Sequence, residues 1–175
     1  KLKQTYELFL ETGRATASIF FLFIAASLYS RMLAISGLPM ATSAWIADFG
    51  LSPMIVIIAF VCVILVMGMF IDAVSILLLT MPIMVPIVQS LGFDLIWFGI
   101  VAIVAVEIGL LTPPFGMVVF VMKASLPYDV DVAEIYMGIM PFFFVLIVVL
   151  ALLIAFPQIT LILPQILFRC PRSQD

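Results

Sequence analysis

The sequence predicts an all-α polytopic membrane protein, and two observations support this prediction. First, 66% of the 175 residues are hydrophobic and only 10% are charged, whereas soluble domains carry about 25% charged residues. Second, stretches without any charged residue cover 49–71, 73–93 and 135–168, and about 20 apolar residues suffice for a helix to cross a bilayer. The stretch MIVIIAFVCVILVMGMF is apolar on every side, which excludes the alternating strands of a membrane barrel and leaves helices as the spanning element.

The composition also excludes several functional classes. The sequence contains no His, and Cys62 and Cys170 are its two cysteines, so neither a disulfide framework nor a metal-ligand spacing is present. The formal net charge is -3, and no cluster of basic residues indicates a nucleic-acid partner. Because the first residue is Lys and no secretory signal sequence is visible, we expect a piece of a longer chain.

The first predicted region, 1–50, contains three elements. Apolar side chains recur at helical spacing over 1–13, which is typical of an amphipathic helix on a membrane surface. The residues that follow, 15–35, are apolar enough to cross the bilayer. Gly37 and Pro39 are expected to end this helix, and the mixed polar and apolar residues after them predict an interfacial segment.

The second predicted region, 51–94, is a helical hairpin. Two apolar stretches, 54–67 and 73–90, are joined by the motif GMFID, which contains a glycine and an acid. Each stretch is short for a membrane crossing, so it belongs either to a pair of short spanning helices or to a re-entrant hairpin that is buried by protein. Pro82 and Pro86 predict an irregular second arm, which favours the re-entrant hairpin.

The third region, 95–122, is predicted to be a discontinuous transmembrane helix. The motif TPP at its centre removes two backbone amide donors and biases the preceding residue away from helical angles. Gly109 and Gly116 flank this motif and loosen the backbone on either side. The last region, 123–175, is predicted to form a polar loop, a final transmembrane helix and a tail.

Two acidic residues lie at predicted membrane depth, Asp72 in the hairpin motif and Glu107 before the TPP motif. An acid there costs about 2.5–3.5 kcal/mol, so it generally faces a cavity or a partner. An interrupted helix supplies complementary groups, because its free carbonyl oxygens can bind a cation and its free amides an anion. Structural roles also explain each feature alone: Asp72 can cap the following helix, and prolines can kink a membrane helix for packing.

The sequence GMFIDAVSILLLTMPIMVPIVQSLGFDLIWFGI, followed by VEIGLLTPPFGMVVFVMK, resembles the C-terminal half of the large membrane subunit of tripartite ATP-independent periplasmic (TRAP) transporters, the DctM-like family. The resemblance covers about residues 10–165. It implies the second of two inverted repeats of an elevator-type transporter in the bacterial inner membrane, with a re-entrant hairpin and a discontinuous helix. It also implies a small membrane subunit and a periplasmic substrate-binding protein as partners, and sodium-driven uptake of organic acids such as C4-dicarboxylates or sialic acids.

The resemblance further implies roles for particular residues at the two interruptions of the chain. A coupling sodium ion would be bound mainly by backbone carbonyl groups, no other cofactor is implied, and the solute would approach side chains nearby. The implied sodium ligands are Gly68, Gly109, Thr112 and Phe115, and the implied solute-binding residues are Asp72, Ser75, Thr112 and Pro113.

Two functions of other classes stay open at this point. Asp72 and a second membrane-embedded acid could share a proton, as in an intramembrane aspartyl protease, although the Gly-x-Gly-Asp motif is absent. Alternatively, a non-catalytic membrane scaffold would use irregular helices only for packing. The presence of both a hairpin motif and a helix-breaking motif in one short chain favours the transporter.

Overall fold

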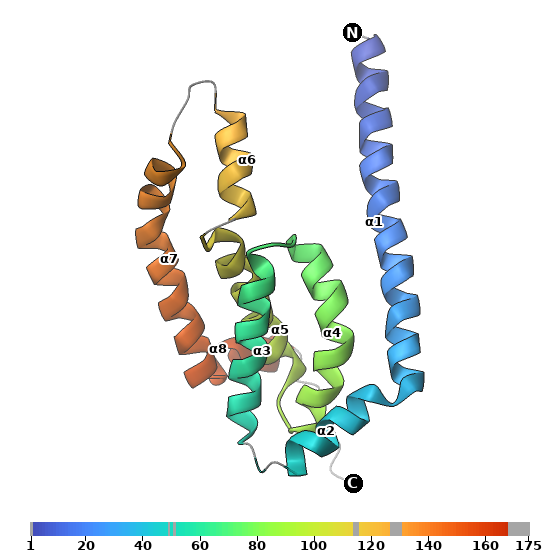
Figure 1. Cartoon of the computed structure of the whole chain (residues 1–175), viewed down its shortest axis with the longest axis vertical. Coiled ribbons are helices and arrows are strands. Elements are labelled where there is room, and N and C mark those ends of the chain that lie inside the picture. The colour runs from blue at the N-terminus through green and yellow to red at the C-terminus, as the bar shows by residue number, and fades with distance from the viewer. Residues whose placement is uncertain (1, 49, 51, 114–115, 127–130, 168–175) are drawn as a thin grey trace.

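The computed structural model of the chain describes residues 2–48, 50, 52–113, 116–126 and 131–167. This part of the chain is helical throughout, without strands (Figure 1), so the all-α prediction is confirmed for it. The helices are α1 (Leu2–Ser36), α2 (Leu38–Asp48), α3 (Pro53–Gly68), α4 (Ala73–Ser90), α5 (Leu95–Leu111), α6 (Met117–Ser125), α7 (Val132–Ala155) and α8 (Gln158–Leu167). By length and composition, α1, α4 and α7 can each cross a membrane, while α3 and α5 are shorter apolar helices.

Helix α1 is continuous, so the surface helix and the first span that the sequence predicts as separate elements form one helix. Its polar residues do not interrupt it, because the hydroxyls of Thr12 and Thr16 each donate to the carbonyl oxygen four residues earlier at 2.8 Å. Gly13 lies between them, and a glycine inside a helix costs only about 1 kcal/mol relative to alanine. That cost is too small to end a helix of this length.

The predicted end of the first helix is confirmed. Gly37 has a left-handed backbone with φ of 67°, which glycine adopts without steric cost, and α2 begins at the next residue with Pro39 in its first turn. Figure 1 shows α2 crossing the lower end of the hairpin while α1 stands beside α4. The predicted interfacial segment is therefore a short helix packed on the hairpin.

Helices α3 and α4 run antiparallel and contact each other, as a hairpin requires. Pro53 stands in the first turn of α3, where its missing amide has no helical acceptor to lose. The second arm differs from the prediction of an irregular segment, because α4 continues as a helix through Pro82 and Pro86. Each proline still deprives a carbonyl four residues earlier of its usual amide donor.

Helix α5 is the centre of the fold. It contacts α3, α4, α6, α7 and α8, and the side chains of its inner face are at most 1% exposed, namely Trp97, Phe98, Val101, Ala102, Ala105 and Val106. Asp94 caps its start by accepting a hydrogen bond from the Ile96 amide at 2.7 Å, which satisfies an amide that a helix start leaves unpaired. This packing fixes the position of the helix that leads into the TPP motif.

Trp97 joins α5 to the end of α7. Its indole N–H donates to the carbonyl oxygen of Leu153 at 2.7 Å. In a continuous helix this carbonyl would accept from residue 157, but residue 157 is a proline without an N–H. A side chain from α5 thus satisfies a carbonyl that α7 cannot satisfy by itself.

Candidate functional site

The tip of the hairpin is a short turn between Gly68 and Ala73. The amides of Phe70 and Ile71 both donate to the Met67 carbonyl oxygen at 3.0 Å, which closes the last turn of α3. Helix α4 then starts immediately after Asp72.

Asp72 caps α4, as the structural alternative for this residue predicts. Its carboxylate accepts a hydrogen bond from the Ser75 amide at 3.0 Å, while the Asp72 side chain as a whole is exposed. Ser75 is partly buried in the first turn of α4. These two residues, both predicted to contact the solute, therefore lie together at the start of the second arm.

The chain is interrupted between α5 and α6 at the TPP motif. Thr112 ends α5 in an extended conformation (φ -76°, ψ 129°), and its amide donates to the Gly109 carbonyl oxygen at 3.0 Å. The Thr112 hydroxyl donates to the Ile108 carbonyl oxygen at 2.7 Å. Gly116 precedes α6, and its amide donates to the Thr112 carbonyl oxygen at 3.2 Å. The break is thus bridged by a few local hydrogen bonds instead of a helical ladder.

The two consecutive prolines decide which carbonyl oxygens are available at this break. In an uninterrupted helix, the carbonyls of Gly109 and Leu110 would accept from residues 113 and 114, which are both prolines. The Gly109 carbonyl accepts from Thr112 instead, whereas the Leu110 carbonyl loses its helical donor. A carbonyl in this position is available to a side chain, a water molecule or an ion.

The hairpin tip and the break meet through their backbones. A Cβ atom on Gly68 would lie 2.7 Å from the Gly109 Cα, and a Cβ atom on Gly109 would lie 2.8 Å from the Gly68 Cα and 2.9 Å from the Leu65 carbonyl oxygen. Both glycines are buried. Only residues without a side chain allow this approach, so the structure brings together two of the four residues predicted to bind sodium.

Helix α7 adds a polar group that the sequence does not single out. The Tyr136 hydroxyl oxygen lies 2.5 Å from the position of a Cβ atom on Gly116, and the Leu110 carbonyl oxygen lies 3.4 Å from the same position. The hydroxyl is buried and has no hydrogen-bond partner among the described residues, although buried polar groups are nearly always hydrogen-bonded. The one signal in the sequence is a tyrosine close after the polar loop, at the start of an apolar span.

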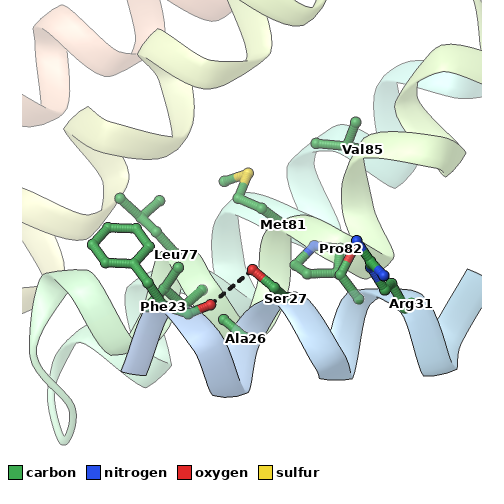
Figure 2. A pocket seen from close by; sticks show the side chains of 10 residues that line it. Phe23, Ala26, Ser27, Arg31, Leu77, Met81, Pro82 and Val85 are labelled. Carbon is green, nitrogen blue, oxygen red and sulfur yellow. Dashed lines mark hydrogen bonds between the residues drawn. The ribbon is translucent and has the colours of Figure 1, made fainter. Parts of the chain in front are cut away.

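Two grooves lie between α1 and the second arm of the hairpin, α4. The larger, of about 550 Å³, is lined by residues that include Ser27, Arg31, Met81 and Pro82; Figure 2 shows Arg31 beside Pro82 and the Ser27 hydroxyl donating to the Phe23 carbonyl oxygen. The smaller, of about 400 Å³, includes Ser75 in its lining. Neither groove is lined by the two glycines at the helix contact, so the grooves are distinct from the break.

Two further residues singled out in the sequence are described near the break, and one is not. Pro113 is exposed directly after Thr112, and Glu107 is exposed on α5 shortly before it. Phe115 lies outside the described residues. The solute contact predicted for Pro113 and the sodium ligand predicted for Phe115 stay predictions, as does the cavity or partner expected to face Glu107.

Taken together, an apolar helical fold with helices long enough to span a membrane, and an interrupted helix packed against a hairpin, indicate a polytopic membrane protein. The family described as "Tripartite ATP-independent periplasmic transporter, DctM component" matches residues 1–159. The chain belongs to this family, the large permease subunits of TRAP transporters, and the resemblance seen in the sequence is confirmed.

Three relatives illustrate the range of the family. The chain is 31% identical over 167 residues to the C4-dicarboxylate TRAP transporter large permease protein DctM of Pseudomonas aeruginosa, covering 94% of this chain and 38% of that protein. It is 31% identical over 160 residues to the sialic acid permease protein SiaM of Vibrio cholerae, covering 91% and 37%. It is 32% identical over 171 residues to the ectoine permease protein TeaC of Halomonas elongata, covering 97% and 39%. The chain thus spans about two fifths of the length of these relatives.

Proposed function

We propose that the chain is part of the large permease subunit of a bacterial inner-membrane transporter that couples the uptake of an organic acid to the inward movement of sodium. In this proposal the chain is the second of two inverted repeats of an elevator-type transporter, and it works with a small membrane subunit and a periplasmic substrate-binding protein. The observation that carries the proposal is the contact between Gly68 and Gly109, because it sets the hairpin turn against the interruption of α5.

Backbone oxygens are the proposed sodium ligands. The glycine contact leaves no side chain between the two helices, so an ion can approach the carbonyl groups around it. The Thr112 hydroxyl uses its hydrogen to bond the Ile108 carbonyl, and its oxygen lone pairs stay available as ligands. Gly68, Gly109, Thr112 and Phe115 are therefore proposed to form the sodium site, mainly through their backbone.

The solute is proposed to be an organic acid of the C4-dicarboxylate or sialic-acid kind. Two of the relatives are named for these solutes, and a third is named for ectoine, so the family name alone does not specify the solute. The start of α6 presents the positive end of a helix, which attracts a carboxylate, whereas the Asp72 carboxylate already caps the start of α4. Asp72, Ser75, Thr112 and Pro113 lie at or next to these helix ends and are the proposed solute contacts.

Uptake measurements with controlled cations test the proposal. The intact subunit that contains this chain, reconstituted into vesicles with its two partners, should accumulate a radiolabelled C4-dicarboxylate or sialic acid when a sodium gradient is imposed. Replacement of sodium by potassium at equal ionic strength should abolish accumulation, since the larger ion does not fit a site built for sodium. Equal accumulation in the two salts would show that the transporter is not sodium-coupled.

A further inference from the structure

We propose that the hydroxyl group of Tyr136 is an additional oxygen ligand of the cation at the interruption between α5 and α6. The inference rests on the proposed sodium-coupled function and adds to the site a residue from α7, which belongs neither to the hairpin nor to the interrupted helix. Two features of the structure support it: a buried hydroxyl without a partner among the described residues, and a neighbouring carbonyl oxygen that lacks its helical donor.

The first feature is the state of the hydroxyl itself. It is buried, and no described residue donates to it or accepts from it. A buried hydroxyl that is never satisfied destabilises the fold, and such groups in native proteins generally serve a function or bind a small ligand. The Tyr136 hydroxyl therefore needs a partner beyond the hydrogen bonds that the described residues offer.

The second feature is a carbonyl oxygen that lies close to the same glycine. The Leu110 carbonyl has no helical donor because residue 114 is a proline. Its oxygen lies 3.4 Å, and the Tyr136 hydroxyl oxygen 2.5 Å, from one position beside Gly116, the position of a Cβ atom on that residue. Gly116 has no Cβ, and the Tyr136 hydroxyl packs against its backbone in the room this leaves, so both oxygen atoms lie on the same side of Gly116.

The two oxygen atoms also restrict the chemistry of the group that could bind them. A carbonyl oxygen only accepts, and a tyrosine hydroxyl oxygen carries lone pairs as well as its hydrogen. A ligand that touches both oxygens must be electron-poor, which fits a cation and disfavours a carboxylate. Neutral oxygens at an interrupted membrane helix are the usual ligands of a transported monovalent cation.

Removal of the hydroxyl in the intact subunit tests the inference. Tyr136→Phe should raise the sodium concentration that half-saturates uptake by about tenfold, the effect expected for the loss of one contact of hydrogen-bond strength. The maximal uptake rate at saturating sodium should stay close to wild type, because the ring keeps its packing. The control is Tyr6→Phe, which removes the hydroxyl of a tyrosine that is 67% exposed on α1 and should change neither value.

A second pair of variants separates the ligand role from packing. Gly116→Ala should lower the melting temperature, because its Cβ would collide with the Tyr136 hydroxyl oxygen at 2.5 Å. In the double variant Gly116→Ala with Tyr136→Phe, the closest remaining atoms stand at 3.4 Å, an ordinary contact. The double variant should therefore recover the melting temperature while the half-saturating sodium concentration stays high.

Three different results would contradict the ligand role of Tyr136, its contact with Gly116, and sodium coupling itself. If Tyr136→Phe leaves the half-saturating sodium concentration at the wild-type value, the ligand role is overturned while sodium coupling stands. If the double variant melts as early as Gly116→Ala alone, the contact on which the inference depends is wrong. If wild-type uptake is the same in potassium as in sodium, the proposed function itself fails, and the ligand role of Tyr136 fails with it.

Discussion

Gly109 and Gly68 are positions at which a single added carbon atom, the Cβ, would disturb the packing of two helices. The atoms that a Cβ on either residue would meet belong to the backbone of the other helix, and a backbone cannot rotate away as a long side chain does. The whole of α3 or α5 would have to shift to make room. Small-to-large changes in packed regions usually cost about 1–3 kcal/mol when neighbours can adjust, and here the neighbours are helix backbones.

We expect Gly109→Ala to reduce both the melting temperature and the uptake rate of the intact subunit, with uptake falling at least about tenfold if the loss is near 1.4 kcal/mol in the site. Gly109→Val should be more severe. Thr112→Val should be milder in stability, by about 1 kcal/mol, since it loses only the hydrogen bond to the Ile108 carbonyl. Vesicle uptake and thermal unfolding measure the two effects.

Gly99→Ala is the matched control for that series. Gly99 lies on the same helix, α5, but no atom stands within 4 Å of its potential Cβ, so alanine there should be neutral or slightly stabilising. Wild-type uptake in Gly109→Ala, or equal losses in both alanine variants, would contradict the role of the glycine contact.

The sequence predicted some residues of this site, such as Gly68 and Gly109, and missed Tyr136. Gly68 and Gly109 stand out because each adjoins a helix-breaking motif. Their mutual contact depends on the relative position of two helices, which local patterns do not encode. Tyr136 is still harder to find, since a tyrosine near the start of an apolar span usually indicates an interfacial anchor.

On the scale of elements, the start of α4 combines a structural and a proposed functional role in one side chain. The Asp72 carboxylate accepts the Ser75 amide at 3.0 Å and carries a negative charge at the turn of the hairpin. Asparagine caps a helix about as well as aspartate, whereas alanine does not. The two substitutions therefore separate the cap from the charge.

We expect Asp72→Ala to destabilise the intact subunit by about 1 kcal/mol through loss of the cap, and Asp72→Asn to keep nearly full stability. If the Asp72 carboxylate accepts a hydrogen bond from a hydroxyl group of the solute, Asp72→Asn should nevertheless raise the solute concentration that half-saturates uptake. Thermal unfolding and solute titrations of both variants measure this. Normal uptake by Asp72→Asn would limit the residue to its capping role.

Element boundaries followed from the sequence wherever a local signal was strong. Gly37 ended α1 and the TPP motif ended α5 as expected. Two expectations about elements were wrong for the same reason: a helix continues through a single residue that disfavours helical structure. α1 passes through Gly13, and α4 keeps its helical course through Pro82 and Pro86, because packing and the remaining hydrogen bonds outweigh the local cost.

At the scale of the whole molecule, the central α5 is well covered while large apolar side chains elsewhere are not. Phe20 and Phe21 of α1 are 64% and 72% exposed, and Phe142 of α7 is 70% exposed. Such surfaces suit hydrocarbon, and the chain accounts for only about two fifths of the length of its relatives. Composition predicted the class of fold, but it did not predict which apolar side chains the helices leave exposed.

Sodium should stabilise the intact subunit against heat. An ion that binds only the folded state adds about 2.7 kcal/mol at a hundred times its dissociation constant, so the melting temperature should rise with sodium and not with potassium at equal ionic strength. A scaffold whose irregular helices serve only packing should melt at the same temperature in both salts. Unfolding in detergent, followed at several concentrations of each salt, separates the two.

The hydrogen bond from Trp97 to Leu153 constrains how this bundle can rearrange. If α7 slid along α5 by one helical turn, the indole N–H and the carbonyl group would lose their hydrogen bond to each other. Without water to replace it, the loss would cost several kcal/mol. This hydrogen bond therefore opposes sliding of α7 along α5.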